Sequence, residues 1–222
     1  MLSNAERKRA RMQNADFDKL SLRQYNFVIG MVILYGFVLN AIMVATLSDF
    51  FMEMDPRVLI IGYFVLVLVG AFMTHSKSPL VSFIGYNFVV VPIGALLSVL
   101  VPSYDVKDIL AAIIATGGVV FIMITISTIY PRVFSKMGRS LFIMLLLGLI
   151  AELVASFVFG YGGDLFNWLF VLIFSLYIGY DWFRAQSYPR TVDNAVDSAL
   201  DIYLDAINIF IRLLAIFGNN DD

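Results

Sequence analysis

The run ILAAIIATGGVVFIMITISTIY, from Ile109 to Tyr130, contains 22 residues and no charged side chain. About 20 mostly apolar residues in a helix are enough to cross the hydrocarbon core of a bilayer. A strand of a membrane barrel would instead alternate apolar and polar residues over about ten positions. The run is apolar over twice that length, so it predicts a membrane-spanning helix. Gly117-Gly118 inside it indicates a close contact with another helix.

Six further runs of the sequence have the same character. They are Tyr25–Leu47, Val58–Met73, Leu80–Val101, Leu141–Gly160, Leu165–Phe183 and Ala195–Phe217. Charged residues, prolines and glycines separate these runs, as turn-forming residues do between helices. The sequence therefore predicts an all-α, polytopic membrane protein built as a bundle of seven transmembrane helices.

The composition of the whole chain agrees with lipid as its solvent. Of the 222 residues, 60% are hydrophobic and 14% are charged, against about 45–50% and about 25% in soluble domains. Cysteine is absent and there is one histidine; this excludes disulfide scaffolds, thiolate zinc sites and histidine-based metal clusters. We expect no tightly bound cofactor, and a lipid bilayer rather than nucleic acid as the partner.

Basic residues are concentrated on one side of the predicted bundle. With the N-terminus inside, the inner segments hold twelve Lys and Arg residues and the outer segments hold two, Arg57 and Lys107. An excess of Lys and Arg is typical of cytoplasmic loops. We therefore expect a multi-pass protein of the cell membrane, with its N-terminus in the cytoplasm and its C-terminus outside. Residues 1–24 would form a basic cytoplasmic leader, residues 25–218 a single membrane domain and residues 219–222 a short external tail.

The informative charged residues within or near the predicted spans are Glu152, Asp181, Asp201, Asp205 and Arg212. A charge at the bilayer centre costs roughly 3 kcal/mol, so such residues tend to face the bundle or water, usually in pairs. Glu152 stands alone in its span. It could form an ion pair with Arg212 on another helix, or it could be protonated.

Asp181 and Asp205 are predicted to lie at the same depth. The link between the last two spans, from Arg184 to about Asp197, is on the cytoplasmic side. Counting the helical rise from this link places both aspartates in the inner third of the bilayer. Antiparallel helices joined by a short link normally pack together. Two carboxyls in contact cannot easily both ionise, so the pair would share a proton and respond to pH.

The last span also carries a polar stripe. Asp201, Asp205, Asn208 and Arg212 occur at i, i+4, i+7 and i+11, and therefore occupy one face of the helix. A span with such a face should lie at the centre of the bundle. These four residues, with Glu152, are candidates to line a water-filled path; the alternative is a polar network that only holds helices together.

The last two spans resemble the paired signature of the Bax inhibitor-1 family, also called transmembrane Bax inhibitor motif proteins. The matching segments are IFSLYIGYD, from Ile173 to Asp181, and YLDAINIFIRLL, from Tyr203 to Leu214. Seven spans and a length near 220 residues look like a small bacterial member. The resemblance implies a pH-sensitive calcium leak in which Asp181 and Asp205 form the sensor and help to bind the cation.

The resemblance also implies a latch on this pair. The family pattern places an arginine at the inner end of the second span, and in an ungapped comparison that position falls on His75. Because histidine titrates near physiological pH, a latch at His75 would itself titrate, or the latch would be lost. A histidine at a helix end can equally be an interfacial residue.

Several functions stay open. A passive cation path is favoured, with calcium and protons as its ligands, because carboxylate oxygens suit a hard cation; a proton-coupled exchanger is a variant. A regulator that binds other membrane proteins without transport is the alternative. Tyr180-Asp181 also resembles half of the intramembrane aspartyl protease arrangement. The sequence around Asp205 lacks the Gly-x-Gly-Asp motif and the later Pro-Ala-Leu, so we expect no enzyme.

Overall fold

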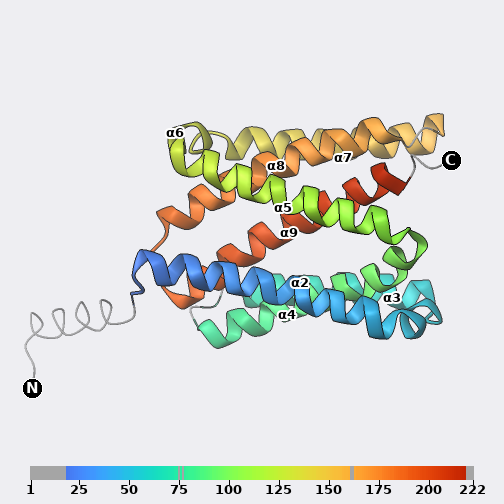
Figure 1. Ribbon diagram of the computed structural model, residues 1–222, viewed down its shortest axis with the longest axis horizontal. Coiled ribbons are helices and arrows are strands. Elements are labelled where there is room, and N and C mark those ends of the chain that lie inside the picture. Colours follow the sequence, from blue (N-terminus) through green and yellow to red (C-terminus); the bar gives the residue numbers. More distant parts are fainter. Residues whose placement is uncertain (1–18, 75, 77, 161–162, 219–222) are drawn as a thin grey trace, which may run out of the picture.

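The structure is a computed structural model that describes residues 19–74, 76, 78–160 and 163–218. Within these residues the chain forms seven long helices that lie side by side (Figure 1). They are α2 (Leu22–Met52), α3 (Pro56–Met73), α4 (Pro79–Leu100), α5 (Val106–Ile129), α7 (Gly138–Phe159), α8 (Asp164–Ser187) and α9 (Val192–Gly218). Two short elements, η1 (Val101–Ser103) and α6 (Pro131–Phe134), lie in the connections.

The predicted all-α membrane bundle is confirmed. Six of the long helices, all but α9, are long and apolar enough to cross a bilayer. Successive long helices run in opposite directions, so the bundle has two ends (Figure 1). We call the end where α2 and α9 begin the N-terminal end, and the end where α9 finishes the C-terminal end.

Local sequence signals explain where the helices begin. Ser21 forms a capping box with Gln24, in which each side chain satisfies the other residue's backbone N–H. Pro56 and Pro79 each occupy the first position of a helix, where the missing N–H costs nothing. Helix α2 thus begins at Leu22, inside the predicted leader 1–24. Most of that leader and the predicted tail 219–222 lie outside the described residues.

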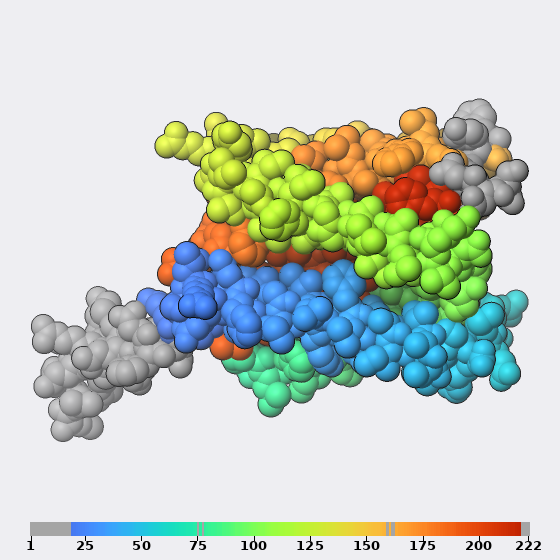
Figure 2. All heavy atoms as spheres, viewed as in Figure 1, coloured from blue at the N-terminus to red at the C-terminus, as the bar shows by residue number. Residues whose placement is uncertain are grey.

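Helix α9 is the centre of the bundle, as the polar stripe predicted. It packs most extensively against α8 and also contacts α2, α4 and α5. Its side chains Ile202, Tyr203, Ile209 and Leu214 are fully buried. Helix α3 packs mainly against α4, and α7 mainly against α8. Figure 2 shows a furrow between α2 and α5 through which α8 and α9 are visible, so this face of the centre is only partly covered.

The predicted close contact at Gly117-Gly118 is wrong. Both glycines are exposed, and a Cβ at either position would meet no atom within 4 Å. Helix α5 instead turns another face, with buried Ala112 and Thr116, toward the bundle. Two other glycines bring α3 and α4 close together, because a Cβ at Gly70 would lie 2.6 Å from the carbonyl oxygen of Gly85.

Candidate cation site on the last two helices

Asp181 of α8 and Asp205 of α9 meet inside the bundle. Their exposed fractions are 7% and 6%, and the two carboxyl groups are close enough to interact with each other. An ionised carboxylate has only acceptors, so a hydrogen bond between two carboxyls needs a proton on one of them. A hydrogen bond across this pair would therefore need one shared proton.

The connection between α8 and α9 brings these two residues together. Residues 188–191 link Ser187 to Val192, and two helices joined by so short a link pack as antiparallel neighbours. Asp181 lies six residues before the end of α8, about 9 Å along the helix axis. Asp181 thus lies toward the N-terminal end of the bundle, whereas Asp205 lies thirteen residues after the start of α9, about 20 Å along its axis. The depth of the pair in a bilayer stays a prediction.

Arg184 supplies the positive charge next to the pair. Its Nη1 lies 3.0 Å from Oδ1 of Asp181 and 3.6 Å from Oδ2 of Asp201. It also donates to the hydroxyl of Tyr188 from Nε at 3.1 Å and from Nη2 at 2.8 Å, and lies over the rings of Tyr180 and Tyr188. The sequence analysis missed this partner, although its i,i+3 spacing from Asp181 was a usable signal.

We call Arg184 and the three carboxyls Asp181, Asp201 and Asp205 the acidic cluster. Arg184 pairs with Asp181 and Asp201, so the cluster carries more carboxyls than cations. Oδ2 of Asp205 is buried and has no hydrogen-bond partner among the described residues. The Asp201 side chain is 41% exposed and lies closer to the N-terminal end. An unpaired buried oxygen beside an exposed carboxylate is an arrangement that would accept a cation arriving from that end.

The described residues contain no group of three or more Asp, Glu, His or Cys side chains placed to hold a metal ion. Calcium takes six to eight oxygen ligands, which need not all come from side chains. A cation at the Asp181–Asp205 pair would therefore complete its shell with water or backbone carbonyls. His75, the predicted latch, lies outside the described residues and stays a prediction.

At the other charged end of the polar stripe, the side chains pair with one another. Arg212 makes a two-pronged ion pair with Glu152 of α7, in which Nη1 meets Oε1 and Nη2 lies 2.9 Å from Oε2. Nη1 also donates to Oδ1 of Asn167 at 3.1 Å, and the guanidinium lies 4.4 Å from the centre of the Phe170 ring. Of the two alternatives for Glu152, the structure shows the ion pair. We call these four residues the arginine clamp.

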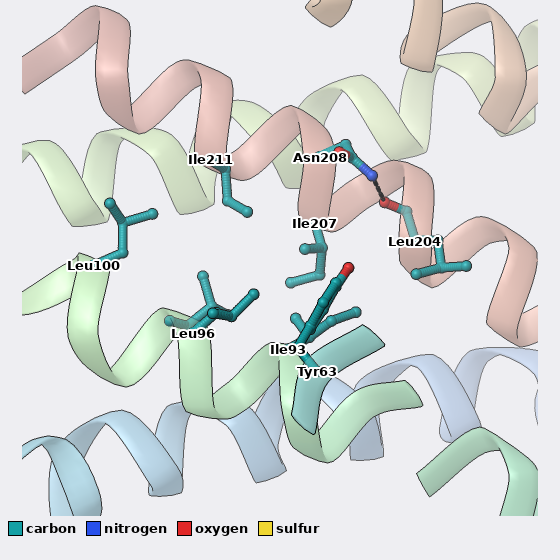
Figure 3. Close-up of a pocket in the computed structure, with 9 residues that line it drawn as sticks. Tyr63, Ile93, Leu96, Leu100, Leu204, Ile207, Asn208 and Ile211 are labelled. Atoms are coloured by element: carbon teal, nitrogen blue, oxygen red, sulfur yellow. Dashed lines mark hydrogen bonds between the residues drawn. The ribbon is translucent and has the colours of Figure 1, made fainter. Parts of the chain in front are cut away.

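Asn208 belongs to the polar stripe and also lines a cavity beside α9. The cavity is bounded by α3, α4 and α9 and has a volume of about 310 Å³ (Figure 3). We call it the α3–α4 cavity. Its lining includes Tyr63, Leu96, Leu100, Leu204, Asn208 and Ile211. Nδ2 of Asn208 donates to the carbonyl oxygen of Leu204 at 2.8 Å, and the Tyr63 hydroxyl points toward α9 (Figure 3).

A second polar contact crosses the middle of the bundle. Nδ2 of Asn40 in α2 donates to the hydroxyl of Tyr203, and Oδ1 of Asn40 is buried with no partner in the described part of the chain. Tyr86 donates to the carbonyl oxygen of Val32 at 2.8 Å. The sequence analysis missed Asn40, because an uncharged amide inside an apolar run gives little signal of its own.

Comparison with known proteins gives consistent matches. A sequence profile described as inhibitor of apoptosis-promoting Bax1 matches residues 18–222. A protein of Helicobacter pylori is 26% identical over 225 aligned positions, covering 95% of each chain. A membrane protein of Streptococcus pyogenes serotype M6 is 30% identical over 167 positions, covering 71% of this chain and 70% of its own. Bax inhibitor 1 of Schizosaccharomyces pombe is 29% identical over 182 positions, covering 78% and 67%.

Proposed function

We propose that this chain, which belongs to the Bax inhibitor-1 family of membrane proteins, is a pH-sensitive calcium leak gated by the Asp181–Asp205 pair. The single observation that carries the proposal is the pair itself. Two carboxyls from neighbouring helices are buried in mutual contact, and one of their oxygens has no partner among the described residues. Lipid-embedded charges of this kind usually mark an ion or proton path.

Protonation supplies the switch. When the pair holds its proton, the two carboxyls hydrogen-bond and α8 and α9 stay joined at this level. When the proton leaves, two adjacent negative charges repel each other unless a cation takes its place. Protons and a cation thus compete for the same oxygens. Cation binding should fall as the pH falls, and the populations of closed and open states should shift with it.

Calcium is the cation that this chemistry favours. Two ionised carboxylates provide hard oxygen ligands and a charge of −2, which matches a divalent ion better than a monovalent one. The proposal places the N-terminal end of the bundle in the cytoplasm, because twelve of the basic residues outside the spans gather on that side. Calcium would then meet the exposed Asp201 carboxylate before the buried pair.

The test is calcium flux through proteoliposomes that contain the purified full chain, measured over a series of pH values. For the wild type we expect flux to change by up to about tenfold per pH unit where the pair exchanges one proton. Asp181→Asn and Asp205→Asn should each flatten this response. Asp105→Asn is the matched control, because Asp105 is exposed at the C-terminal end and its side chain caps no helix. An unchanged pH response in both pair variants would contradict the gating model.

A regulator that binds other membrane proteins is the second candidate. It is favoured by one observation, that the Schizosaccharomyces pombe relative is named Bax inhibitor 1. This candidate predicts that the purified chain conducts no calcium and that partner binding survives Asp205→Asn. A proton-coupled exchanger would differ from a leak because an imposed pH gradient would drive calcium against its own gradient. The matched family is not a known family of enzymes, and we propose no enzymatic activity.

A further inference from the structure

We propose that a cation travelling between the Asp181–Asp205 pair and the C-terminal end passes through the α3–α4 cavity, with Asn208 as the residue that joins the two. The inference rests on the proposed calcium leak and specifies its second half. It also assigns the arginine clamp a structural role outside the path. Arg212 and Glu152, which the sequence suggested as pore-lining residues, would thus lie beside the route and not on it.

The position of the cavity along α9 is the first support. Leu204 and Asn208 both line it, and they lie one residue before and three residues after Asp205. Residues three apart in a helix share neighbouring positions on its surface. Leu100, another lining residue, is the last residue of α4 and lies near the C-terminal end. The lining residues of the cavity therefore lie at levels between the buried pair and that end.

The size of the cavity is the second support. Calcium keeps six to eight oxygen ligands, and eight water molecules at about 30 Å³ each occupy about 240 Å³. The cavity volume of about 310 Å³ has room for a calcium ion with one complete shell of water. An ion of this kind would not have to lose its whole shell between the carboxyl pair and the aqueous side.

The chemistry of the lining is the third support. No charged residue is among the described residues that line the cavity. Oδ1 of Asn208 has no hydrogen-bond partner among the described residues, and the Tyr63 hydroxyl reaches toward α9 from the opposite wall (Figure 3). These two oxygens can hold water or a passing cation. The remaining walls are apolar. Apolar constrictions block ions when water leaves them, so this half of the path can close without a charged side chain that blocks it.

The Arg212 end of the polar stripe offers no comparable route. The guanidinium is held there by Glu152, Asn167 and the Phe170 ring. A divalent cation that continued along the stripe from Asn208 to Arg212 would have to displace this ion pair and approach a fixed positive charge. Electrostatics and packing thus both favour a turn at Asn208 into the α3–α4 cavity, which carries dipoles and an open volume.

The chain contains no cysteine, so single cysteines can test the route without background labelling. Leu100→Cys and Asn208→Cys place a thiol in the cavity, and Asn167→Cys places one in the arginine clamp. Each full-length variant is reconstituted in proteoliposomes and treated with a positively charged, membrane-impermeant methanethiosulfonate. Calcium flux is recorded before and after treatment, and labelling is measured separately by mass spectrometry.

We expect both cavity thiols to be labelled and their calcium flux to fall by about tenfold. This is the repulsion between a unit charge and a divalent ion about 6 Å apart, even at the dielectric constant of water. Flux through Asn167→Cys should stay within about twofold, because salt and solvent screen a charge outside the path. Labelled cavity thiols with unchanged flux would overturn the inference, as would a block confined to Asn167→Cys.

Failure of the proposed function would be distinguishable from failure of this inference. Flux in the untreated wild type tests the calcium leak alone. If the wild type conducts nothing, labelling alone decides whether water and cations reach the cavity. Labelling of both Leu100→Cys and Asn208→Cys would support a hydrated cavity, and protection of both thiols would rule it out.

Discussion

The two charged regions of α9 each combine one guanidinium with carboxylates, and they differ in the balance of charge. The arginine clamp joins one guanidinium to one carboxylate and adds an amide and an aromatic ring. The acidic cluster sets one guanidinium among three carboxyls and leaves a buried Asp205 oxygen unpartnered in the described structure. Charged side chains that pair with one another hold helices together. A cluster with surplus carboxylates has oxygen atoms left over, and these are what a cation would bind.

The largest expected effect on stability comes from breaking the balanced region. Glu152→Ala leaves the Arg212 guanidinium without its carboxylate, and we expect it to lower the free energy of unfolding by about 3 kcal/mol. Replacing both residues by apolar ones, as in Glu152→Leu with Arg212→Met, should recover most of this loss. Thermal unfolding in detergent measures both, with exposed Glu53→Ala as the control. A loss that matches the control would show that the clamp is not structural.

Removing the single cation of the acidic cluster should have a smaller effect that depends on pH. Arg184→Gln leaves the carboxylates of Asp181 and Asp201 without their counter-charge, so we expect a loss of about 2 kcal/mol at about pH 8. The loss should shrink at low pH, because protonated carboxyls no longer need the guanidinium. Unfolding curves at several pH values measure it, with Arg190→Gln as the exposed control. A loss that does not change with pH would contradict this account of the contact.

Removing one of the surplus carboxylates should raise the free energy of unfolding instead of lowering it. In Asp205→Asn the amide can donate to the Asp181 carboxylate, and no proton has to be shared. We expect the variant to be about 1 kcal/mol more stable than the wild type at neutral pH, because functional carboxylates are often held at a cost to stability. Asp181→Asn should not gain as much, since it also loses the ion pair with Arg184. Destabilisation by Asp205→Asn would show that the pair serves packing.

The smallest effect is expected at the exposed rim of the cluster. The Asp201 side chain is 41% exposed and lies 3.6 Å from Arg184. Exposed ion pairs contribute about 0–1 kcal/mol, so Asp201→Asn should change stability by less than about 0.5 kcal/mol. Its effect should instead be seen as a higher calcium concentration for half-maximal flux. A stability loss as large as that of Glu152→Ala would place Asp201 among the structural residues.

Hydropathy and the helical period of about 3.6 residues predicted those features of the site that are set within a single helix. The apolar runs gave the seven long helices, and the spacing of Asp201, Asp205, Asn208 and Arg212 gave the central position of α9. The short link between α8 and α9 predicted the contact of Asp181 with Asp205, because it leaves the two helices few ways to pack.

Features that depend on how several helices fit together could not be predicted in this way. Asn167 reaches Arg212 at the level where α7, α8 and α9 meet, and no spacing within one helix reports this. The α3–α4 cavity likewise follows from how three helices fit together. At Gly117-Gly118 the sequence predicted a contact that the structure does not have. A pair of small residues permits a close contact between helices but does not require one.

If Asp181 binds a divalent ion as proposed, its position along α8 would expose that ion to part of the membrane potential. Asp181 lies about 9 Å from the end of α8, which is about a quarter of the helix length. A divalent ion that reaches it from the N-terminal end has crossed a similar fraction of the field, which is worth about 1 kcal/mol per 100 mV. Occupancy of the site would therefore change several-fold between an energised and a depolarised cell, in addition to its response to pH.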